Sequence, residues 1–394
     1  MRTLAYCTFF PEPDNHGDAI RRGMILRALR QTCDLTIVAV RRPSTTTDDE
    51  SRFRQQFPEA EIHIFDPDFS ASKTPGQRAR RVMSGIRRLV PAWVMSQHSE
   101  QAVAKIHSLA QEHDAVLLVG EPSGLAARGL DHARVIWDKS NVLTASLRSA
   151  IRGPRSFFER WHARANLPLA RRFERKVIEA CSDIWVTSEE ENRRLCEEFK
   201  FDADVSVIPS AVAGSPRSVT LDANGPFVWM SSLSYTDNWI GLIELLQTIV
   251  DEGIDTLRVR VIGGGSSAAQ RKELARFSFV DFYGFAEDLS ASLQGARAGI
   301  VPVWTGAGVK LKTLTLINFG IPIIATECAL EGIPAEAAYA VPTSAKDFVS
   351  VMVGYDSLKS ETIAKNAQQI VDANLSSTAF EYRVTDAICR GDES

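Results

Sequence analysis

Paired cysteines, long apolar runs and a leader-like N-terminus are all missing from this sequence. No stretch approaches the ~18 apolar residues that are needed to span a bilayer. The first residues, MRTLAYCTFFPEP, contain no long apolar region and no small-residue cleavage site, so we expect no signal peptide. We therefore expect a cytoplasmic protein that at most contacts the cytoplasmic face of a membrane. Scattered cysteines without a CxxC pair or a metal-like spacing indicate a reducing compartment and buried thiols; they are Cys7, Cys33, Cys181, Cys196, Cys328 and Cys389.

The whole chain has nearly equal numbers of positive and negative residues, but one region has a clear excess of positive charge. Of 394 residues, 45 are Lys or Arg and 49 are Asp or Glu, which gives a formal net charge of −4. Residues 71–180 alone hold 19 Lys or Arg against 9 Asp or Glu, mainly in two expected basic helices, 76–88 and 152–176. Solvated helix faces explain such runs, and so does a surface that contacts anionic lipid or a phosphate-bearing acceptor. No recognition motif accompanies the charge, so nucleic acid is not an expected partner.

Short β-branched runs alternate with amphipathic stretches from end to end, except over residues 211–226. There Gly, Pro, Ser, Asp and Asn accumulate and the periodicity is lost. Such alternation argues for parallel sheets covered on both faces, and the length argues for more than one core. We predict an α/β protein with two doubly wound, Rossmann-like sheets facing across a cleft. The predicted parts are an N-terminal domain 1–210, a linker 211–226, a C-terminal domain 227–375 and a helix 376–394 that packs back on the first domain.

Seven strands are predicted before the linker and six after it, the last of them AAYAVP at 337–342. The longest helix is expected to run from about residue 140 to 181. Asp48 and Asp49 fall in a polar helical region and are expected to be exposed. No convincing DxD-type pair is found, so we predict no metal site.

The stretch GAGVKLKTLTLINFGIPIIAT, residues 306–326, has the pattern of an anion-binding loop. The motif Gly306-Ala307-Gly308 follows a predicted strand, and its glycines allow close backbone approach or positive φ. The helix that begins next directs free N–H groups toward whatever lies beside the loop. Lys310 and Lys312 add cations at the helix start, where they are unfavourable unless an anion is present. Lysines that merely project into solvent are the alternative.

Two other strand-to-helix connections contain glycines. RVRVIGGGSSAAQ satisfies GxGxx(G/A) through Gly263, Gly265 and Ala268, which leaves a nicotinamide or flavin enzyme as an alternative, although no acid ends the next strand as expected. In the first half, Gly17 precedes Arg21 and its neighbour on the first helix. A tight turn explains this glycine, while the arginines can equally reach an acidic group in the cleft.

With these pieces in place, the chain resembles retaining glycosyltransferases of the GT-B fold, in the group-one class also called family four. The resemblance covers nearly the whole chain and is strongest from about Phe227 to Ile333. After the linker it is carried by VWMSSLSYTDN, RVRVIGGG, FVDFYGFAEDL, GAGVKLKTLTLINFGIPIIAT and ALEGI. Before the linker, HGDAIRRGMILRALR looks like the glycine loop and first helix of that class, and VIWDKSNVLTASL looks like its acceptor-side segment.

The resemblance implies roles for particular residues. Lys310 and Lys312 become the cations that stabilise the leaving diphosphate, and Asp138 becomes an acceptor-side polar contact in the catalytic set, with a strand-end cap as its alternative. Arg21 and Asn141 are expected on the acceptor side. That class needs no metal ion, so a nucleoside diphosphate sugar is the only small molecule expected besides the acceptor. The implied donor-binding residues are Gly17, Ser232, Asn238, Gly263, Gly284, Phe285, Gly306, Ala307, Gly308, Thr315 and Glu331.

The sequence also departs from that class, which usually has two glutamates eight residues apart. Here the two positions are Ala307 and Thr315. A threonine hydroxyl can still hydrogen-bond a ribose, as a neutral and shorter partner. The implied function is sugar transfer to a hydroxyl with retained configuration, in glycan, glycolipid or glycosylated metabolite biosynthesis. The alternatives are a non-catalytic relative that acts as a partner subunit, and a sugar-nucleotide epimerase or oxidoreductase.

Overall fold

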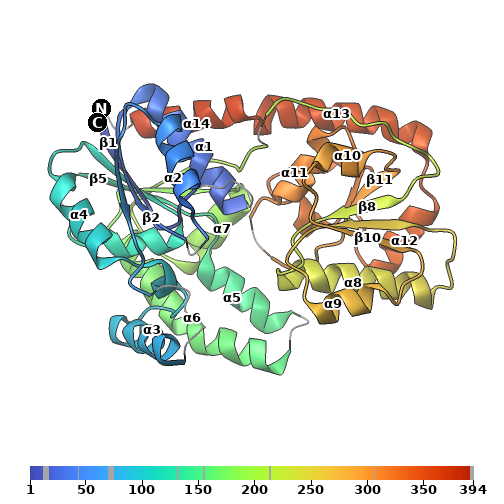
Figure 1. Ribbon diagram of the computed structural model, residues 1–394, viewed down its shortest axis with the longest axis horizontal. Coiled ribbons are helices and arrows are strands. Elements are labelled where there is room, and N and C mark those ends of the chain that lie inside the picture. The colour runs from blue at the N-terminus through green and yellow to red at the C-terminus, as the bar shows by residue number, and fades with distance from the viewer. Residues whose placement is uncertain are drawn as a thin grey trace. The chain divides into compact units, whose positions relative to one another are not determined.

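The computed structural model describes residues 1–11, 17–42, 44–69, 75–130, 133–153, 156–212, 214–306 and 308–390. The chain divides into two compact units, each built on one parallel sheet with helices on both faces (Figure 1). Unit 1 is Met1–Pro209 together with the chain from Phe380 onward, and unit 2 is Ser210–Ala379. Two doubly wound parallel sheets confirm the predicted fold class. Among the described residues, no helix is long and apolar enough to cross a membrane.

The sheet of unit 1 has seven parallel strands, as the sequence predicted. Their order is β3-β2-β1-β4-β5-β6-β7. The central strands are nearly continuous apolar runs because helices cover both faces, and every residue of β4 is buried. The strands are β1 (Arg2–Cys7), β2 (Asp34–Val40), β3 (Glu61–Phe65), β4 (Ala115–Val119), β5 (Arg134–Asp138), β6 (Asp183–Val186) and β7 (Asp204–Val207).

One helix prediction for unit 1 is wrong. The expected helix 140–181 is two helices, because a Ser-x-x-Glu capping box starts a new one: Ser156 Oγ accepts the backbone N–H of Glu159, whose carboxylate accepts the Ser156 N–H. The second basic stretch therefore includes only the end of one helix and most of the next. The helices are α1 (Gly17–Thr32), α2 (Thr47–Gln56), α3 (Pro75–Arg88), α4 (Glu100–Ala110), α5 (Leu143–Arg152), α6 (Phe157–Ile178) and α7 (Glu189–Glu198), with 3₁₀ turns η1 (Val94–Gln97) and η2 (Glu121–Ala126).

The adjacent acids of α2 have different environments. Asp48 is exposed, as predicted, but Asp49 is buried, which corrects the prediction. The Asp49 carboxylate accepts the backbone N–H of Thr46 at 2.8 Å, and Thr46 Oγ1 accepts the Asp49 N–H at 3.2 Å. This pair is a helix-capping device.

The sheet of unit 2 has five parallel strands in the order β10-β9-β8-β11-β12. The sixth predicted strand, 337–342, does not form. The backbone of Tyr339 and Ala340 meets β12 at an isolated bridge, and Pro342, two residues after Ala340, cannot donate to a ladder. The five strands are β8 (Phe227–Met230), β9 (Val259–Ile262), β10 (Val280–Gly284), β11 (Ala298–Val301) and β12 (Ile323–Ala325).

Two hydrophobic clusters cover the opposite faces of this sheet. One contains Val228 of β8 and Leu314 of α11 (Leu311–Asn318), and the other contains Trp229 of β8 and Leu245 of α8 (Thr236–Asp251). Gly241 brings its helix close to the sheet, since a Cβ there would lie 1.7 Å from the Pro302 carbonyl oxygen. The helices are α8 (Thr236–Asp251), α9 (Ala268–Leu274), α10 (Leu289–Leu293), α11 (Leu311–Asn318), α12 (Ala345–Val353), α13 (Ser357–Leu375) and α14 (Ser377–Cys389), with 3₁₀ turns η3 (Glu327–Leu330) and η4 (Ala335–Ala337).

The segments that join the units are held by backbone hydrogen bonds. Within 211–226, Val212 N–H donates to the Leu375 carbonyl at 3.0 Å, and Arg217 N–H donates to the Asn318 carbonyl at 2.8 Å, so this stretch runs along unit 2. At the other end of the chain, α14 enters unit 1. Arg134 donates to the Ile388 carbonyl at 2.7 Å and pairs with Asp183 at 2.6 Å, which fixes the end of α14 beside β5 and β6.

Candidate functional site

Strand order reverses in unit 2 between β8 and β11. At such a switch point the loops after the two strands diverge and leave a crevice beyond the carboxyl ends, where α/β sheets bind ligands. The loops that follow β8, β9, β10 and β11 contain most of the residues singled out in the second half of the sequence. The site can therefore be described within unit 2 alone.

The loop between β11 and α11 has the predicted glycine conformation. Gly306 has φ of 129° and Gly308 has φ of 76°, so both lie in the region that favours glycine. Lys310 is the N-cap of α11, contributes no side-chain cap, and donates its Nζ proton to the Gly308 carbonyl at 2.6 Å. The helix thus begins with a cation and without a side-chain acceptor at its N-cap. Ala307, predicted as a donor contact, lies outside the described residues.

The most informative contact of the site joins Lys312 to Asn238. Lys312 Nζ donates to Asn238 Oδ1. The amide of Asn238 in turn donates to Ser231 Oγ at 2.6 Å and to the Ser232 carbonyl at 3.1 Å. Lys312 and Asn238 are 74 positions apart in the sequence and are in direct contact across the switch point. The sequence analysis had placed both in the donor site, but in separate loops.

The charge of Lys312 is finely balanced. Burial, with a smaller contribution from the neighbouring Lys310, lowers the pKa of Lys312 to about 7, while Asp237 acts in the opposite direction. A buried ammonium is unfavourable without a counter-charge. An anionic ligand beside the two lysines would supply one.

A glycine platform lies on the other side of the β8 loop. Gly263 has φ of 159°, and a Cβ there would lie 1.7 Å from the Ser231 carbonyl oxygen, so a larger residue does not fit. Its N–H donates to the Gly284 carbonyl at 2.6 Å. Phe285 is 70% exposed and its ring packs against the backbone of Gly264. The predicted residues Ser232, Gly263, Gly284 and Phe285 thus belong to adjoining loops, with an aromatic ring left open to solvent.

Thr315 and Glu331 differ in what they can offer a ligand. The Thr315 hydroxyl donates to the Leu311 carbonyl at 2.8 Å, so its oxygen is left to act as an acceptor. Glu331 is buried, and its carboxylate accepts the Gly308 N–H at 3.0 Å. Glu331 therefore holds the backbone of the glycine loop in place at Gly308.

Four predicted residues belong to unit 1: Asp138, Arg21 and Asn141, which were expected on the acceptor side, and Gly17, which was expected to bind the donor. Asp138 and Arg21 are engaged with each other. Asp138 ends β5 and is 1% exposed; it forms an ion pair with Arg21 at 2.6 Å. Arg21 also donates to the Ile208 carbonyl at 2.8 Å. The Asn141 N–H donates to Glu121 at 2.9 Å, and Gly17 is the exposed first residue of α1. The structure thus gives Asp138 and Arg21 a structural role, and their contact with an acceptor stays a prediction.

A fully buried charge pair beside this segment was not found from the sequence. Lys139 and Glu174 are both 0% exposed and hydrogen-bonded to each other. Glu174 also accepts the N–H of Leu143 at 2.7 Å and the N–H of Thr144 at 2.9 Å, which caps α5. The sequence offers one signal, an acid that interrupts the basic run RRFERK. Its partner, 35 residues away, carries none.

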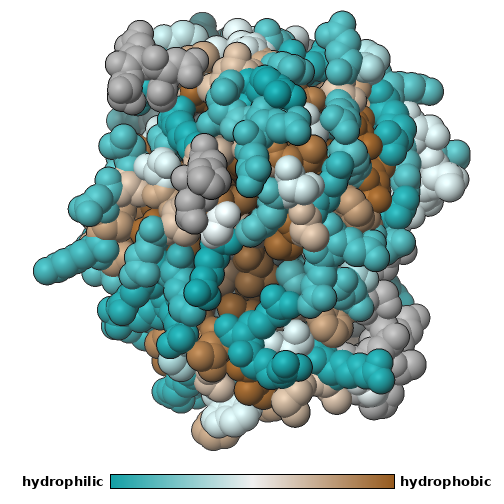
Figure 2. Space-filling view, turned by 90° about the vertical axis from the view of Figure 1, so that its left-hand side faces the viewer, coloured by the Kyte–Doolittle hydropathy of each residue, from teal (hydrophilic) through white to brown (hydrophobic). Residues whose placement is uncertain are grey.

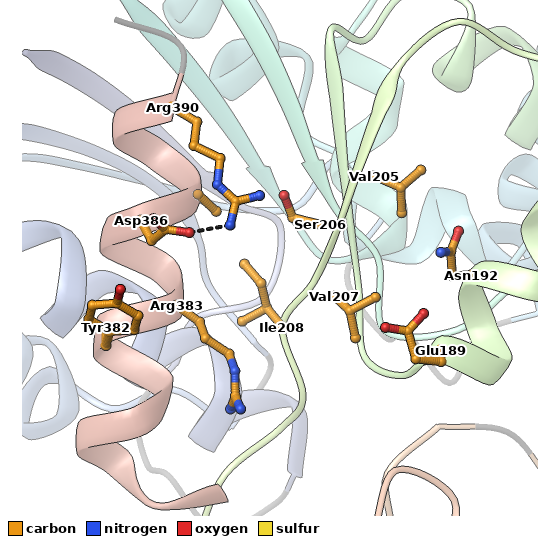
Figure 3. Close-up of a pocket in the computed structure, with 11 residues that line it drawn as sticks. Glu189, Asn192, Val205, Ser206, Val207, Ile208, Tyr382, Arg383, Asp386 and Arg390 are labelled. Carbon is orange, nitrogen blue, oxygen red and sulfur yellow. Dashed lines mark hydrogen bonds and ion pairs between the residues drawn. The ribbon is translucent and has the colours of Figure 1, made fainter. Parts of the chain in front are cut away.

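A pocket of about 550 Å³ lies in unit 1 between α14, α7 and β7 (Figure 3). Arg390 pairs with Asp386 on the helix side, and Glu189 lies on the opposite side. The pocket shares no residue with the glycine loops of unit 2. It could not be predicted, because it arises where the end of the chain returns to the edge strand β7.

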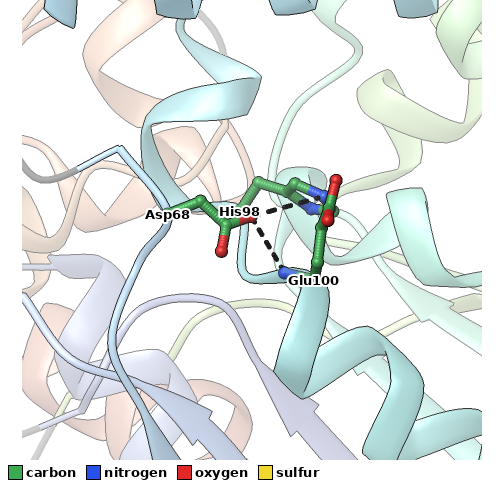
Figure 4. A group of neighbouring side chains, drawn as sticks. All are labelled: Asp68, His98 and Glu100. Atoms are coloured by element: carbon green, nitrogen blue, oxygen red, sulfur yellow. Dashed lines mark hydrogen bonds and ion pairs between the residues drawn. The ribbon is translucent and has the colours of Figure 1, made fainter.

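Asp68, His98 and Glu100 lie together in unit 1 (Figure 4), and their ligand atoms are within 4.8 Å of one another. Both acids have structural roles. Asp68 accepts the Glu100 N–H at 2.9 Å, which caps the start of α4, and Glu100 pairs with Arg88 at 2.7 Å. We assign this cluster to the attachment of α4.

Comparison with known proteins bears on unit 2 first. Residues 226–354 match the family model described as Glycosyl transferases group 1, so unit 2 contains a domain of that description. No curated protein matches the chain in sequence.

Solved structures match over the full length. Sucrose-phosphate synthase from Thermosynechococcus elongatus is similar over 100% of both chains, with a TM-score of 0.72 and 14% identity. HepE from Anabaena, in complex with UDP and glucose, is similar over 99% of this chain and 100% of its own, with a TM-score of 0.64 and 13% identity. At this identity the likeness shows the fold, which is that of GT-B glycosyltransferases.

Proposed function

We propose that the protein is a retaining glycosyltransferase that moves a sugar from a nucleoside diphosphate sugar to an acceptor hydroxyl. The observation that carries the proposal is the contact between Lys312 and Asn238, beside the glycine loop 306–308 and inside the region that matches the group 1 family model. Cations at a helix start are unfavourable alone and favourable with an anion. The diphosphate of such a donor is an anion of the required size.

In this proposal the donor lies across the loops at the carboxyl edge of the second sheet. Its diphosphate contacts Lys310, Lys312 and the free N–H groups at the start of α11. The Ser232 loop and Gly263 lie along the diphosphate, where only a residue without a side chain admits close backbone approach. The base lies against Gly284 and Phe285, and a ribose hydroxyl donates to Thr315.

The reaction breaks the bond between the anomeric carbon and the terminal phosphate oxygen and forms a bond from the same carbon to the acceptor oxygen. The bonding electron pair leaves with the nucleoside diphosphate, and the acceptor proton moves to a departing phosphate oxygen. Negative charge grows on the phosphate as the bond breaks, so the lysines and helix amides act mainly in the transition state. These fixed cations supply the charge that a metal ion would supply elsewhere, and we propose no metal.

The first test is a thermal-shift titration without added metal against UDP, GDP, ADP, TDP, CMP and NAD. Because HepE was solved with UDP, we expect UDP to give the largest shift. A ligand at ~100 times its dissociation constant stabilises the fold by about 2.7 kcal/mol, which is several degrees. A shift with NAD alone would favour the oxidoreductase alternative, and no shift with any of them would remove the proposed site.

The non-catalytic alternative rests on a specific observation, the Thr315 hydroxyl that is already bonded to its own helix. Release of sugar from a labelled donor distinguishes a glycosyltransferase from a non-catalytic relative. Binding of UDP without release or transfer of sugar would favour a partner subunit. The anomeric configuration of the product, read by NMR, tests retention.

Diphosphate binding is expected to weaken as the pH rises through about 7. Burial lowers the pKa of Lys312 to about 7, so above that pH a ligand that needs the ammonium must take up a proton on binding. Between about pH 6.5 and 8.5 the dissociation constant of UDP should rise by up to ~20-fold. Lys312→Arg keeps its charge throughout and should flatten this rise. The same slope in both proteins would mean that another group titrates.

A further inference from the structure

Helix α3 presents its apolar stripe to solvent. Its sequence, PGQRARRVMSGIRR, places apolar residues at 79, 82, 83 and 86, the spacing of one helix face. On an ordinary surface helix this stripe faces the core. Here Val82 is 45% exposed, Met83 is 59% exposed and Ile86 is 53% exposed. The buried side has Gly85 instead, where a Cβ would lie only 3.0 Å from the Val90 carbonyl oxygen. The helix is thus attached by its small-residue side.

The exposed stripe continues past the end of α3. Leu89 is 40% exposed with φ of 55°, and among the described residues it is the only non-glycine residue with positive φ. A leucine in this conformation is strained, and glycine is the usual residue there. Trp93, 38% exposed, follows in the next turn. A strained backbone conformation at a leucine whose side chain is exposed indicates that this side chain has a function at the surface.

The start of α6 has a second exposed apolar group. Phe157 is 75% exposed, Phe158 is 70% exposed and Trp161 is 56% exposed; the last two rings stack with centroids 6.4 Å apart. Both α3 and α6 lie at the lower edge of unit 1 in Figure 1. We call the set Val82, Met83, Ile86, Leu89, Trp93, Phe157, Phe158 and Trp161 the apolar edge.

Positive charge predominates around the apolar edge, although Glu159 lies between Phe158 and Trp161 in the sequence and Glu100 pairs with Arg88. Residues 75–93 contain no Asp or Glu, while Arg80, Arg87 and Arg88 on α3 are exposed. At this side of unit 1, hydrophobic residues interrupt the hydrophilic surface at the lower end of Figure 2. Apolar side chains flanked by arginines are what a helix needs to lie in the interface of an anionic bilayer.

We propose that the apolar edge docks unit 1 on the surface of an anionic lipid bilayer. A second copy of the chain fits less well, because a symmetric contact would set the α3 arginines against each other. Nucleic acid fits less well too: the aromatic residues of the edge can stack on bases, but no nucleic-acid recognition motif accompanies the basic residues. The inference deepens the proposed function by naming the surface on which the acceptor is met, but docking itself does not depend on sugar transfer.

Co-sedimentation of the full chain with vesicles tests the proposal. We expect binding to equimolar phosphatidylcholine and phosphatidylglycerol vesicles to exceed binding to phosphatidylcholine alone by at least about tenfold. The double variants Met83→Glu/Ile86→Glu and Phe158→Glu/Trp161→Glu should each lose most of that binding. Leu358→Glu is the matched control, because this side chain is 83% exposed on α13 of unit 2, and it should bind like the wild type.

Several results would overturn the proposal: no binding to anionic vesicles, full binding by both double variants, or equal loss in the control. So would a wild-type dimer in solution that the same variants dissociate, or RNA binding that competes with the vesicles. The UDP thermal shift of each variant separates this inference from the proposed function. Lost vesicle binding with an unchanged UDP shift supports docking, whereas docking without any UDP shift contradicts only the transferase.

Discussion

Lys312→Ala is expected to lower the rate of sugar transfer at subsaturating donor by about 10²–10³-fold, in the range seen when one group that stabilises developing charge is removed. Lys312 is half-buried against Asn238, so the ammonium is positioned before the diphosphate arrives. Its removal leaves Asn238 Oδ1 without that donor and leaves the phosphate with Lys310 as the nearest cation. Initial rates with labelled donor, combined with a UDP titration, measure the loss in catalysis and in binding separately.

A matched control is available on the same unit. Lys365 is an exposed lysine of α13, and Lys365→Ala should leave the rate within about twofold, as expected for surface substitutions away from a site. An unchanged melting temperature in Lys312→Ala would assign the loss to the site. Wild-type transfer by this variant would show that the diphosphate does not lie where we place it.

Glu174→Ala is expected to reduce the free energy of unfolding by about 3–5 kcal/mol, the cost of leaving one charge of a buried pair without its partner. Lys139 would keep a charge at a position that is 0% exposed. The N–H groups of Leu143 and Thr144 would also lose their acceptor, each a further cost. Urea unfolding followed by circular dichroism measures the change.

Two further variants test the reason for that loss. Glu179→Ala, at the exposed C-terminal end of the same helix, should change the free energy of unfolding by less than about 0.5 kcal/mol. Lys139→Met combined with Glu174→Gln removes both charges and keeps an acceptor oxygen for one of the two N–H groups, which donate to different oxygens of Glu174. It should therefore recover part of the lost stability. A double variant as unstable as Glu174→Ala would mean that packing, not charge, makes the position critical.

The sequence predicted the elements well where the local signal was strong. All seven strands of unit 1 and the first five of unit 2 follow from short β-branched runs, and the end of α11 follows from Gly320, which has φ of 70°. The two wrong predictions of a helix or strand come from competing local signals. The Ser156 capping box divided the expected long helix. The segment expected as a sixth strand begins in the 3₁₀ turn η4 and ends at Pro342, which cannot donate to a ladder.

The sequence alone determined the α/β class, the glycine loops and the two lysines, because these depend on neighbours within a few residues. Only the tertiary structure decided that Lys312 contacts Asn238, that Asp138 pairs with Arg21, and that Glu174 holds Lys139. It also decided which side of α3 is buried. The helical period shows that the apolar residues lie on one face of the helix, but not whether that face is turned to the core or to solvent. Partners 35 to 117 residues apart are joined when strands are ordered in a sheet, and no local pattern records that order.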